Sequence, residues 1–292
     1  MSLGSDDFVV PVDKQEGPTS HDIVGAARRA IGTRRIGHTG TLDPFASGLL
    51  LLCIGRATRL AEYLSGMDKR YEAVARLGVT TDTLDRDGQV MSVCEVDVSE
   101  SQIKSALDDL VGTVEQVPPQ FSAKKVDGVA MHRRARRGEN VELPACTVNV
   151  YDIELLSVDL PEVRFAVRCS SGTYIRSIAR DLGAALEVGA HLAGLRRTEI
   201  GSFSVADAIG VEAFADKGAV ARAALDPLDA LAHLPTLSID DEVAQRVIHG
   251  QKIRLPSDDV ASGIVTVSHL GQLLAIAEVV DGLLKPSKVF AA

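Results

Sequence analysis

Residues 37–44 of this sequence read GHTGTLDP, and the apolar run Leu49–Ile54 follows closely. Two glycines, two threonines and a proline in so short a stretch predict a tight, rigid loop, and the apolar run predicts a buried strand. Because Pro44 restricts the residue before it to extended conformations, we expect Asp43 to project from the loop. A carboxylate held there suits a nucleophile or a general base. An Asx turn, in which Asp43 caps nearby amides, is the more common explanation of the pattern alone.

Outward from this loop, apolar periodicity predicts a mixture of helices and strands, an α+β (mixed α/β) fold class. A helix precedes the loop over about 20–31, capped by Thr19 or Ser20 and closed by Gly32. The elements predicted after it are a helix near 58–64, an alternating strand over 71–77, a helix that begins at the capping box of Ser99 and Gln102, a half-buried strand over 163–169 and a helix over 175–182. Short strands over 263–267, 273–280 and 284–290 predict a small β-rich module at the end of the chain.

Composition excludes several classes of protein. The chain has 292 residues, 46% of them hydrophobic and 24% charged, which indicates a folded globular protein. Its longest apolar run is too short for a membrane span, and the acidic segment 1–7 does not resemble a secretory signal. Cysteine and histidine spacings match no metal site and no glycine-rich phosphate loop occurs, so we expect neither a metal nor another cofactor. Four scattered cysteines suggest reduced thiols and a cytoplasmic location.

Charge is distributed unevenly along the chain. The net charge is −9, which by itself argues against a nucleic-acid partner, yet residues 118–144 are basic. This segment reads as an insertion that projects from the body and is longer than a usual connection, which favours a function such as gripping RNA phosphates, although an ordinary solvated loop fits the pattern equally well. The basic residues expected to contact an RNA backbone are Lys124, Lys125, Arg133, Arg134, Arg136 and Arg137.

Arg176 stands at the start of the helix predicted over 175–182, where acidic residues are usually favoured. An arginine paired there with an aspartate would keep a partly buried carboxylate ionised and fix its orientation. A solvent-exposed arginine is the more common explanation of this position taken alone.

Taken in order, spaced motifs between residues 12 and 203 resemble the TruB family of bacterial tRNA pseudouridine synthases. The motifs are VDK at 12–14, RIGHTGTLDP at 35–44, ASGLL at 46–50, DKRY at 68–71, RLG at 76–78, TDT at 81–83, DRDG at 85–88, YIR at 174–176, DLG at 181–183 and LRR at 195–197. Gln15 departs from the family pattern, which usually has proline after the lysine.

The resemblance implies a fold and a set of roles. It implies a catalytic domain over residues 1–232, with a central, mostly antiparallel sheet flanked by helices, and a PUA-like module over 233–292. Asp43 matches the catalytic aspartate, Arg176 the arginine paired with it, and Tyr71 the tyrosine that stacks on the uracil and takes the C5 proton. The positions implied for substrate binding are His38, Tyr174, Leu195, Asp85 and Lys14.

The implied activity is isomerisation of the T-loop uridine at position 55 of tRNA by a monomer that needs no guide RNA and flips the target base. Three alternatives remain at this stage. A non-catalytic RNA-binding scaffold would release no hydrogen from C5 of the uridine. A glycosidase or nucleoside hydrolase would release free base and usually needs a second carboxylate. A guide-RNA-dependent relative would fail on a bare T-arm stem-loop.

Overall fold

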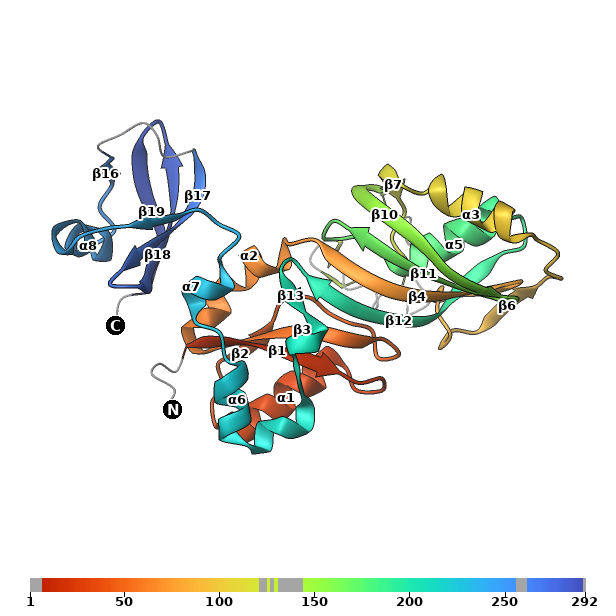
Figure 1. Cartoon of the computed structure of the whole chain (residues 1–292), viewed down its shortest axis with the longest axis horizontal. Helices are drawn as coiled ribbons and strands as arrows, with labels where there is room; N and C mark the ends of the chain where they lie inside the picture. Colours follow the sequence, from red (N-terminus) through yellow and green to blue (C-terminus); the bar gives the residue numbers. More distant parts are fainter. Residues whose placement is uncertain (1–6, 121–124, 127–128, 131–143, 256–261, 291–292) are drawn as a thin grey trace.

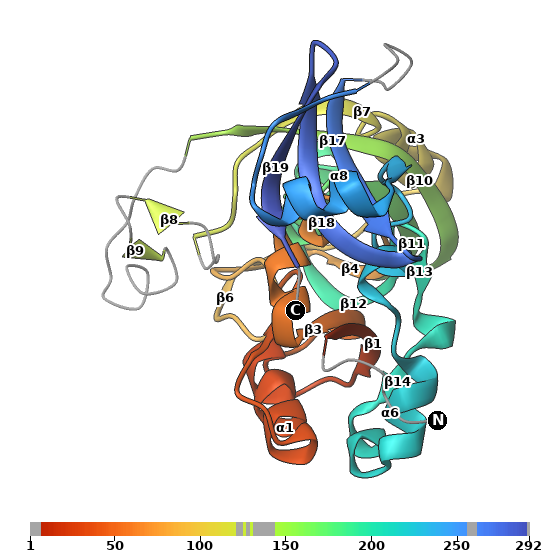
Figure 2. The same ribbon diagram turned by 90° about the vertical axis from the view of Figure 1, so that its left-hand side faces the viewer.

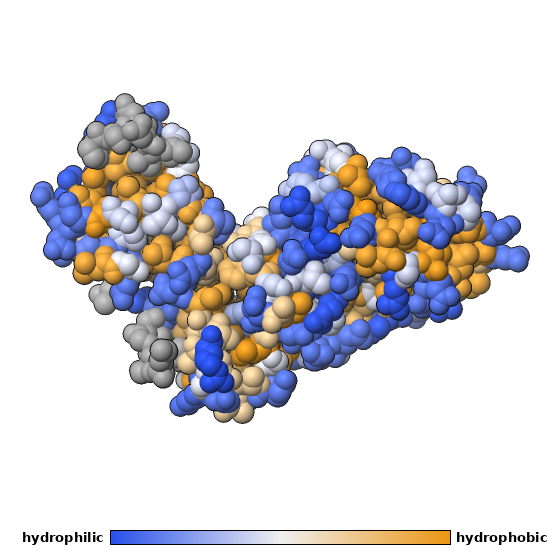
Figure 3. All heavy atoms as spheres, viewed as in Figure 1, coloured by the Kyte–Doolittle hydropathy of each residue, from blue (hydrophilic) through white to orange (hydrophobic). Residues whose placement is uncertain are grey.

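The computed structural model describes residues 7–120, 125–126, 129–130, 144–255 and 262–290. A large body built on one broad sheet carries a smaller C-terminal module at one end (Figure 1). In the space-filling view the body and the module form two lobes with a hollow between them (Figure 3). The chain contains both helices and strands, so the mixed α/β fold class expected from periodicity is confirmed.

The large sheet has the strand order β14-β1-β3-β12-β4-β11-β10-β7, with β2 beside β3 and β13 beside β12. Two of the described pairs, β1 with β14 and β3 with β12, are parallel, and the other pairs of this sheet are antiparallel. The strands are β1 (Phe8–Lys14), β2 (Ile36–His38), β3 (Ser47–Ile54), β4 (Lys69–Leu77), β7 (Gly112–Gln116), β10 (Cys146–Asp159), β11 (Glu162–Cys169), β12 (Ala190–Ile200), β13 (Phe203–Ser204) and β14 (Ile209–Gly210).

Strand β3 lies between β1 and β12 and is buried almost throughout, as its apolar run predicts. Its parallel partner β12 approaches it closely at Gly48, which has a φ of 103°. A Cβ atom added at Gly48 would lie 2.2 Å from the carbonyl oxygen of Arg197, so only glycine fits. This close approach brings the residues before β3 next to the end of β12.

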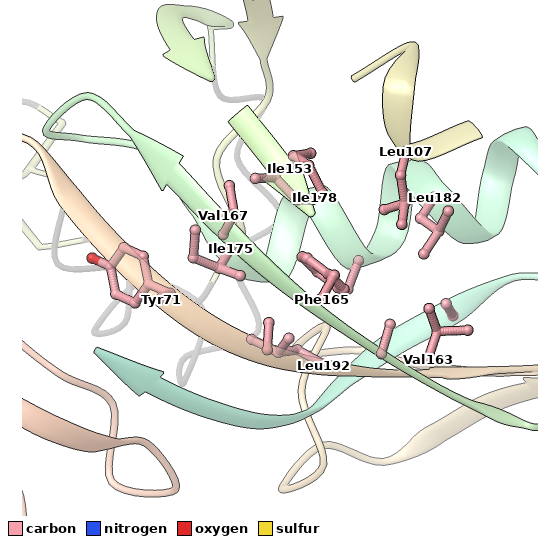
Figure 4. Close-up of a cluster of buried hydrophobic side chains, with 14 of the residues drawn as sticks. Tyr71, Leu107, Ile153, Val163, Phe165, Val167, Ile175, Ile178, Leu182 and Leu192 are labelled. Atoms are coloured by element: carbon pink, nitrogen blue, oxygen red, sulfur yellow. The ribbon is translucent and has the colours of Figure 1, made fainter. Parts of the chain in front are cut away.

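Three helices flank the sheet, and two of them, α1 (Ser20–Ile31) and α3 (Glu100–Asp108), begin at capping boxes. Helix α1 begins at the box between Thr19 and Asp22 and ends at Gly32, as expected. Helices α3 and α5 (Ile175–Ala185) cover the face of β4, β11 and β12 that carries the largest apolar cluster. Figure 4 shows Leu107 and Ile178 from these helices packed with Phe165 of β11. The alternation predicted for β4 is also present, since Tyr71, Ala73, Ala75 and Leu77 are all buried.

The helix predicted near residues 58–64 differs from the observed segment. A 3₁₀ helix, η1 (Gly55–Leu60), comes first and the short helix α2 (Ala61–Ser65) follows. The hydroxyl of Thr58 donates to the carbonyl oxygen of Gly55 at 2.8 Å, a local bond that favours the tighter turn. Other short elements are β5 (Val79–Thr81), β6 (Val90–Val93), β8 (Lys125–Val126), β9 (Val129–Ala130), η2 (Val205–Asp207), η3 (Val211–Ala215), α6 (Lys217–Ala223) and α7 (Pro227–Ala230).

The C-terminal module contains a five-stranded sheet with the order β15-β17-β18-β19-β16. Its elements are β15 (Thr236–Ser238), α8 (Asp241–Ile248), β16 (Ile253–Arg254), β17 (Gly263–His269), β18 (Gln272–Val280) and β19 (Leu283–Val289). All three strands expected here are present, and Asp240 caps α8. Figure 2 shows the curled sheet with α8 beside it. Ile276 and Phe290 share an apolar cluster with Leu60 of the body, so the two parts pack together.

Among the described residues, no helix has both the length and the apolar character needed to cross a membrane.

Candidate active site

The loop of residues 39–46 joins β2 to β3 and is fixed by polar contacts from its neighbours. The Ser20 hydroxyl, at the start of α1, accepts from the amide of Leu42 at 2.9 Å and donates to its carbonyl at 3.1 Å. The amide of Ala46 donates to the carbonyl of Asp43 at 3.1 Å, which closes a turn. These contacts use backbone amides and carbonyls of the loop as hydrogen-bond partners. The Asp43 carboxylate is not needed for them and points out of the loop.

Lys14, the last residue of β1, lies underneath this loop. Its Nζ lies 3.2, 3.3 and 2.5 Å from the carbonyl oxygens of Asp43, Pro44 and Ala46, and 3.1 Å from that of Gln15. The side chain is completely buried, and burial lowers its pKa from 10.5 to about 8 although the charge of Asp43 opposes this shift. Lys14 thus holds the loop from below. It is not among the residues that line the cavity above, and its part in substrate binding stays a prediction.

A cavity of about 280 Å³ opens above the loop. Asp43, Tyr71, Tyr174, Arg176 and Leu195 all line it, so these five residues predicted from sequence come together in one place. Asp43 comes from the loop, Tyr71 from β4 and Leu195 from β12. Tyr174 and Arg176 lie close together at the start of α5. Other residues in the wall come from the loop, α2, the turn before α5 and the first position of α5: Thr39, Gly40, Thr41, Leu42, Ser65, Gly172, Thr173 and Ile175.

Arg176 is buried and bridges two carboxylates. Its Nε lies 3.2 Å from Oδ2 of Asp43, and its Nη1 lies 2.9 Å from Oδ2 of Asp85. The Asp43 carboxylate therefore pairs with an arginine rather than capping local amides, which resolves the alternatives left open for both residues. Burial raises the pKa of Asp43, and the guanidinium of Arg176 opposes that rise. About a third of the Asp43 side chain, 35%, remains exposed.

Asp85 does not line the cavity; it lies behind Arg176. Its Oδ1 accepts from the Thr83 hydroxyl at 2.6 Å and from the amide of Asp87 at 3.1 Å. Nη1 of Arg176 also donates to the carbonyl of Thr83 at 3.0 Å. This network leaves Arg176 one well-defined orientation, with Nε directed to Asp43.

Tyr71 lies on β4 at the end of the apolar cluster. Figure 4 shows its ring near Ile175 and its hydroxyl directed away from the apolar side chains. Burial raises the pKa of the phenol, whereas the nearby guanidinium of Arg197 lowers it in part. Tyr174, which precedes α5, is held by its backbone: Gln116 of β7 accepts from its amide at 2.7 Å and donates to its carbonyl at 3.1 Å.

His38 supports the loop and is not part of the cavity wall. Its Nδ1 accepts from the amide of Gly40 at 3.3 Å, and burial lowers its pKa. The basic residues expected to hold RNA fall largely outside the described residues. Only the backbone of Lys125, in β8, is described; Lys124, Arg133, Arg134, Arg136 and Arg137 lie outside.

Two charged residues of the cavity wall, Lys69 and Arg197, were not predicted as site residues from the sequence. Lys69 donates to the carbonyls of Ser65 at 2.6 Å and Met67 at 2.5 Å, and burial lowers its pKa to about 8. A signal was present, because strand alternation puts Lys69 on the same face as Tyr71 and Arg197 on the same face as Leu195. Among the described residues, no cluster of His, Cys, Asp and Glu has a geometry that holds a metal ion.

Comparison with known proteins identifies the family. Three family descriptions match in succession: the N-terminal domain of TruB family pseudouridylate synthase over residues 28–175, the tRNA pseudouridylate synthase B C-terminal domain over 176–233, and the pseudouridine synthase II TruB C-terminal region over 235–290. The chain is 40% identical to tRNA pseudouridine synthase B of Burkholderia lata over 289 residues, which covers 97% of this chain and 90% of the relative. It is 39% identical to the enzyme of the same name from Geobacillus thermodenitrificans, with coverages of 97% and 99%.

Solved structures give the same result for the fold. A chain of an H/ACA ribonucleoprotein bound to a substrate RNA containing 2′-deoxyuridine matches with a TM-score of 0.77 at 26% identity, covering 98% of this chain and 85% of that one. A chain of an archaeal box H/ACA complex matches with a TM-score of 0.76 at 27% identity, covering 98% and 86%. The protein therefore has the pseudouridine synthase fold with a PUA-like C-terminal region, and the chain belongs to the TruB family of tRNA pseudouridine synthases, which are isomerases.

Proposed function

We propose that this enzyme converts uridine 55 in the T loop of tRNA to pseudouridine, as a monomer and without a guide RNA, a metal or another cofactor. The observation that carries the proposal is the ion pair of Asp43 with buried Arg176 at a cavity that Tyr71 and Tyr174 also line. A tRNA substrate agrees with the names of the relatives that match nearly the whole chain.

The reaction breaks the bond from C1′ to N1, turns the uracil over and joins C1′ to C5. One hydrogen leaves C5 and one arrives at N1, with no net oxidation and no consumption of water. The carboxylate of Asp43 acts on the sugar, either by attack on C1′ or by removal of the hydrogen from C2′. Arg176 keeps this carboxylate ionised against the burial that raises its pKa.

The target base has to leave the folded T loop before either step is possible. Tyr71, with its ring at the cavity, offers a stacking surface worth about 1–3 kcal/mol per base in comparable sites. Leu195 and Tyr174 close the wall around the extruded base and exclude water, which would otherwise hydrolyse the broken glycosidic bond. His38 braces the loop on which Asp43 stands.

Parts of the chain outside the cavity would bind the RNA backbone. We propose that residues 1–232 form the catalytic domain, that the basic segment 118–144 holds backbone phosphates, and that residues 233–292 form the PUA-like module. The separate sheet of the module supports this division. The fold alone also fits a guide-dependent enzyme, since the solved structures that match are from H/ACA ribonucleoproteins.

The decisive experiment uses the purified chain and a bare T-arm stem-loop labelled with tritium at C5 of uridine. We expect release of tritium that matches formation of pseudouridine, with no free uracil and no added protein or RNA. Free uracil as the main product would indicate a hydrolase. No release from the stem-loop or from whole tRNA, with binding intact, would contradict the proposed activity.

A further inference from the structure

Arg197 lies beneath the cavity and has no part in the chemistry described so far. Only 2% of its surface is exposed, although it is a charged residue that lines the cavity wall. In the antiparallel pairing of β12 with β4 it is the direct partner of Tyr71. Arg196, the preceding residue, projects to the other face of the strand and pairs with Asp13 at 2.9 Å.

The guanidinium of Arg197 connects three elements. Its Nε donates to the carbonyl of Leu49 in β3 at 2.7 Å, and its Nη2 donates to the carbonyl of Gly40 in the loop at 3.1 Å. As the direct cross-strand partner of Tyr71, it projects from the same face of the sheet, and both residues line the cavity. Arginine has no acceptor atom, so in a contact between the two side chains only the phenol oxygen can accept, and the hydrogen of the phenol is left to point into the cavity.

The charge of Arg197 is not neutralised by a direct ion pair. Arg176 pairs with two carboxylates, whereas Arg197 has no carboxylate within salt-bridge distance among the described residues. A buried cation in this state acts strongly on its neighbours, and Tyr71 is the ionisable side chain that stands directly opposite it in the strand pairing at the cavity. The expected consequence is preferential stabilisation of a phenolate on Tyr71 at the moment it forms.

We propose that Arg197 is a positioning residue that orients the phenol of Tyr71 and stabilises its phenolate while hydrogen moves between the uracil and Tyr71. The hydrogen count closes: the phenol gives its hydrogen to N1, the phenolate takes the hydrogen of C5, and Tyr71 ends as a phenol. This role rests on the proposed function, because it assigns the residue that supports Tyr71 in that reaction.

A double-mutant cycle tests it. Arg197→Gln, Tyr71→Phe and the double variant are compared with the unaltered chain by the single-turnover rate and the affinity for tRNA. We expect Arg197→Gln to slow the single turnover about 100-fold while affinity stays within about 3-fold, as for loss of one donor at a reacting group. In the Tyr71→Phe background the same change is expected to have an effect of about 2-fold or less.

Two further variants separate positioning from folding. Arg196→Gln, which removes a neighbouring arginine on the opposite face, is the matched control and is expected to react at nearly the normal rate. Arg197→Lys keeps the charge and is expected to recover about 10-fold of the lost rate with an unchanged melting temperature. It also replaces Arg197→Gln in the cycle if the glutamine variant does not fold.

The isotope effect at C5 gives an independent readout. If Arg197 assists the transfer of the C5 hydrogen, deuterium at C5 slows the Arg197 variants more than the unaltered chain. Equal losses with and without the Tyr71→Phe substitution, together with no change in the isotope effect, would overturn the positioning role and leave only loop support. An unaltered chain that forms no pseudouridine would instead refute the proposed function itself.

Discussion

The catalytic loop and the C-terminal module are each fastened by lysine, and the two attachments differ in burial. Lys14 places its ammonium among the carbonyls of Asp43, Pro44 and Ala46 and is fully buried. Lys288, in β19, donates to the carbonyl of Arg59 at 2.7 Å and pairs with Glu62, and its side chain is 23% exposed. Both lysines donate to backbone carbonyls, but the ammonium of Lys14 is shielded from water whereas that of Lys288 is partly exposed to it.

Other contacts besides Lys288 also hold the module to the body. Arg56 and Arg59 donate to the carbonyls of Phe290 and Val289 at 2.7 and 2.6 Å, and the guanidinium of Arg59 lies 4.8 Å from the ring centroid of Phe290. At the loop, Lys14 is the buried side chain that donates to all three of these carbonyls, and the amides of Ala46 and Gly17 donate to those of Asp43 and Pro44 as well. A single substitution is thus expected to matter greatly at the loop and little at the module, because buried charges are poorly screened and surface pairs are weak.

The largest effect is expected at the residue that the loop presents. Asp43→Asn removes the ionised oxygen without changing shape, so the single-turnover rate is expected to fall about 10³-fold or more while tRNA affinity is nearly unchanged. Quench-flow turnover and filter binding measure the two quantities. Asp181→Asn, on the surface of α5, is the control. Turnover of Asp43→Asn near the normal rate would show that the loop serves another purpose.

Loss of the buried anchor is expected to be the next largest effect. Lys14→Met removes the buried side-chain donor shared by three loop carbonyls, so the free energy of unfolding is expected to fall by about 3 kcal/mol. A shift of Asp43 by about 1 Å would also reduce turnover about 100-fold. Urea unfolding and single-turnover rates measure both. A stable variant with normal turnover would mean that the loop holds its shape without Lys14.

The pH dependence of stability is a second test of the buried lysine beneath the loop. The pKa of Lys14 is about 8 in the folded chain and 10.5 as the ordinary value, so between these pH values the unfolded state holds more protons. The free energy of unfolding of the unaltered chain therefore rises with pH in this window. Its difference from that of Lys14→Met is expected to change by an amount on the order of 1 kcal/mol. Lys69, which has the same shift, is present in both chains and cancels. Urea unfolding at pH 7.5 and 9.5 measures the difference, and a constant difference would contradict the assignment.

The smallest effect is expected at the module. Lys288→Met is expected to lower the free energy of unfolding by about 0.5 kcal/mol, and added salt should remove much of that difference. Turnover on a T-arm stem-loop is expected to stay within about 2-fold of normal, because the module attachment does not reach the cavity. A loss as large as that of Lys14→Met would remove the distinction between the two attachments.

Local chemistry specified much of the fold in advance. The capping box at Ser99, the buried run of β3 and the alternation of β4 follow from nearest neighbours and were predicted correctly, and of the two caps offered for α1 the structure has Thr19. The pairing of Arg176 with an aspartate was also expected, whereas its second partner, Asp85, was not predicted to pair with it.

The order of residues alone specified the helices α1, α3 and α5, the strands β3, β4 and β11 and the motifs that carry the chemistry, since these are written in short stretches of neighbouring residues. The strands β1, β10 and β12 were not predicted. The three-dimensional arrangement of the strands selected which buried cations serve the loop and the phenol. Lys14 reaches the loop because β1 lies beside β3, and Arg197 reaches Tyr71 because β12 lies beside β4. Strand order thus joins residues from distant parts of the chain, and no local pattern specifies that order.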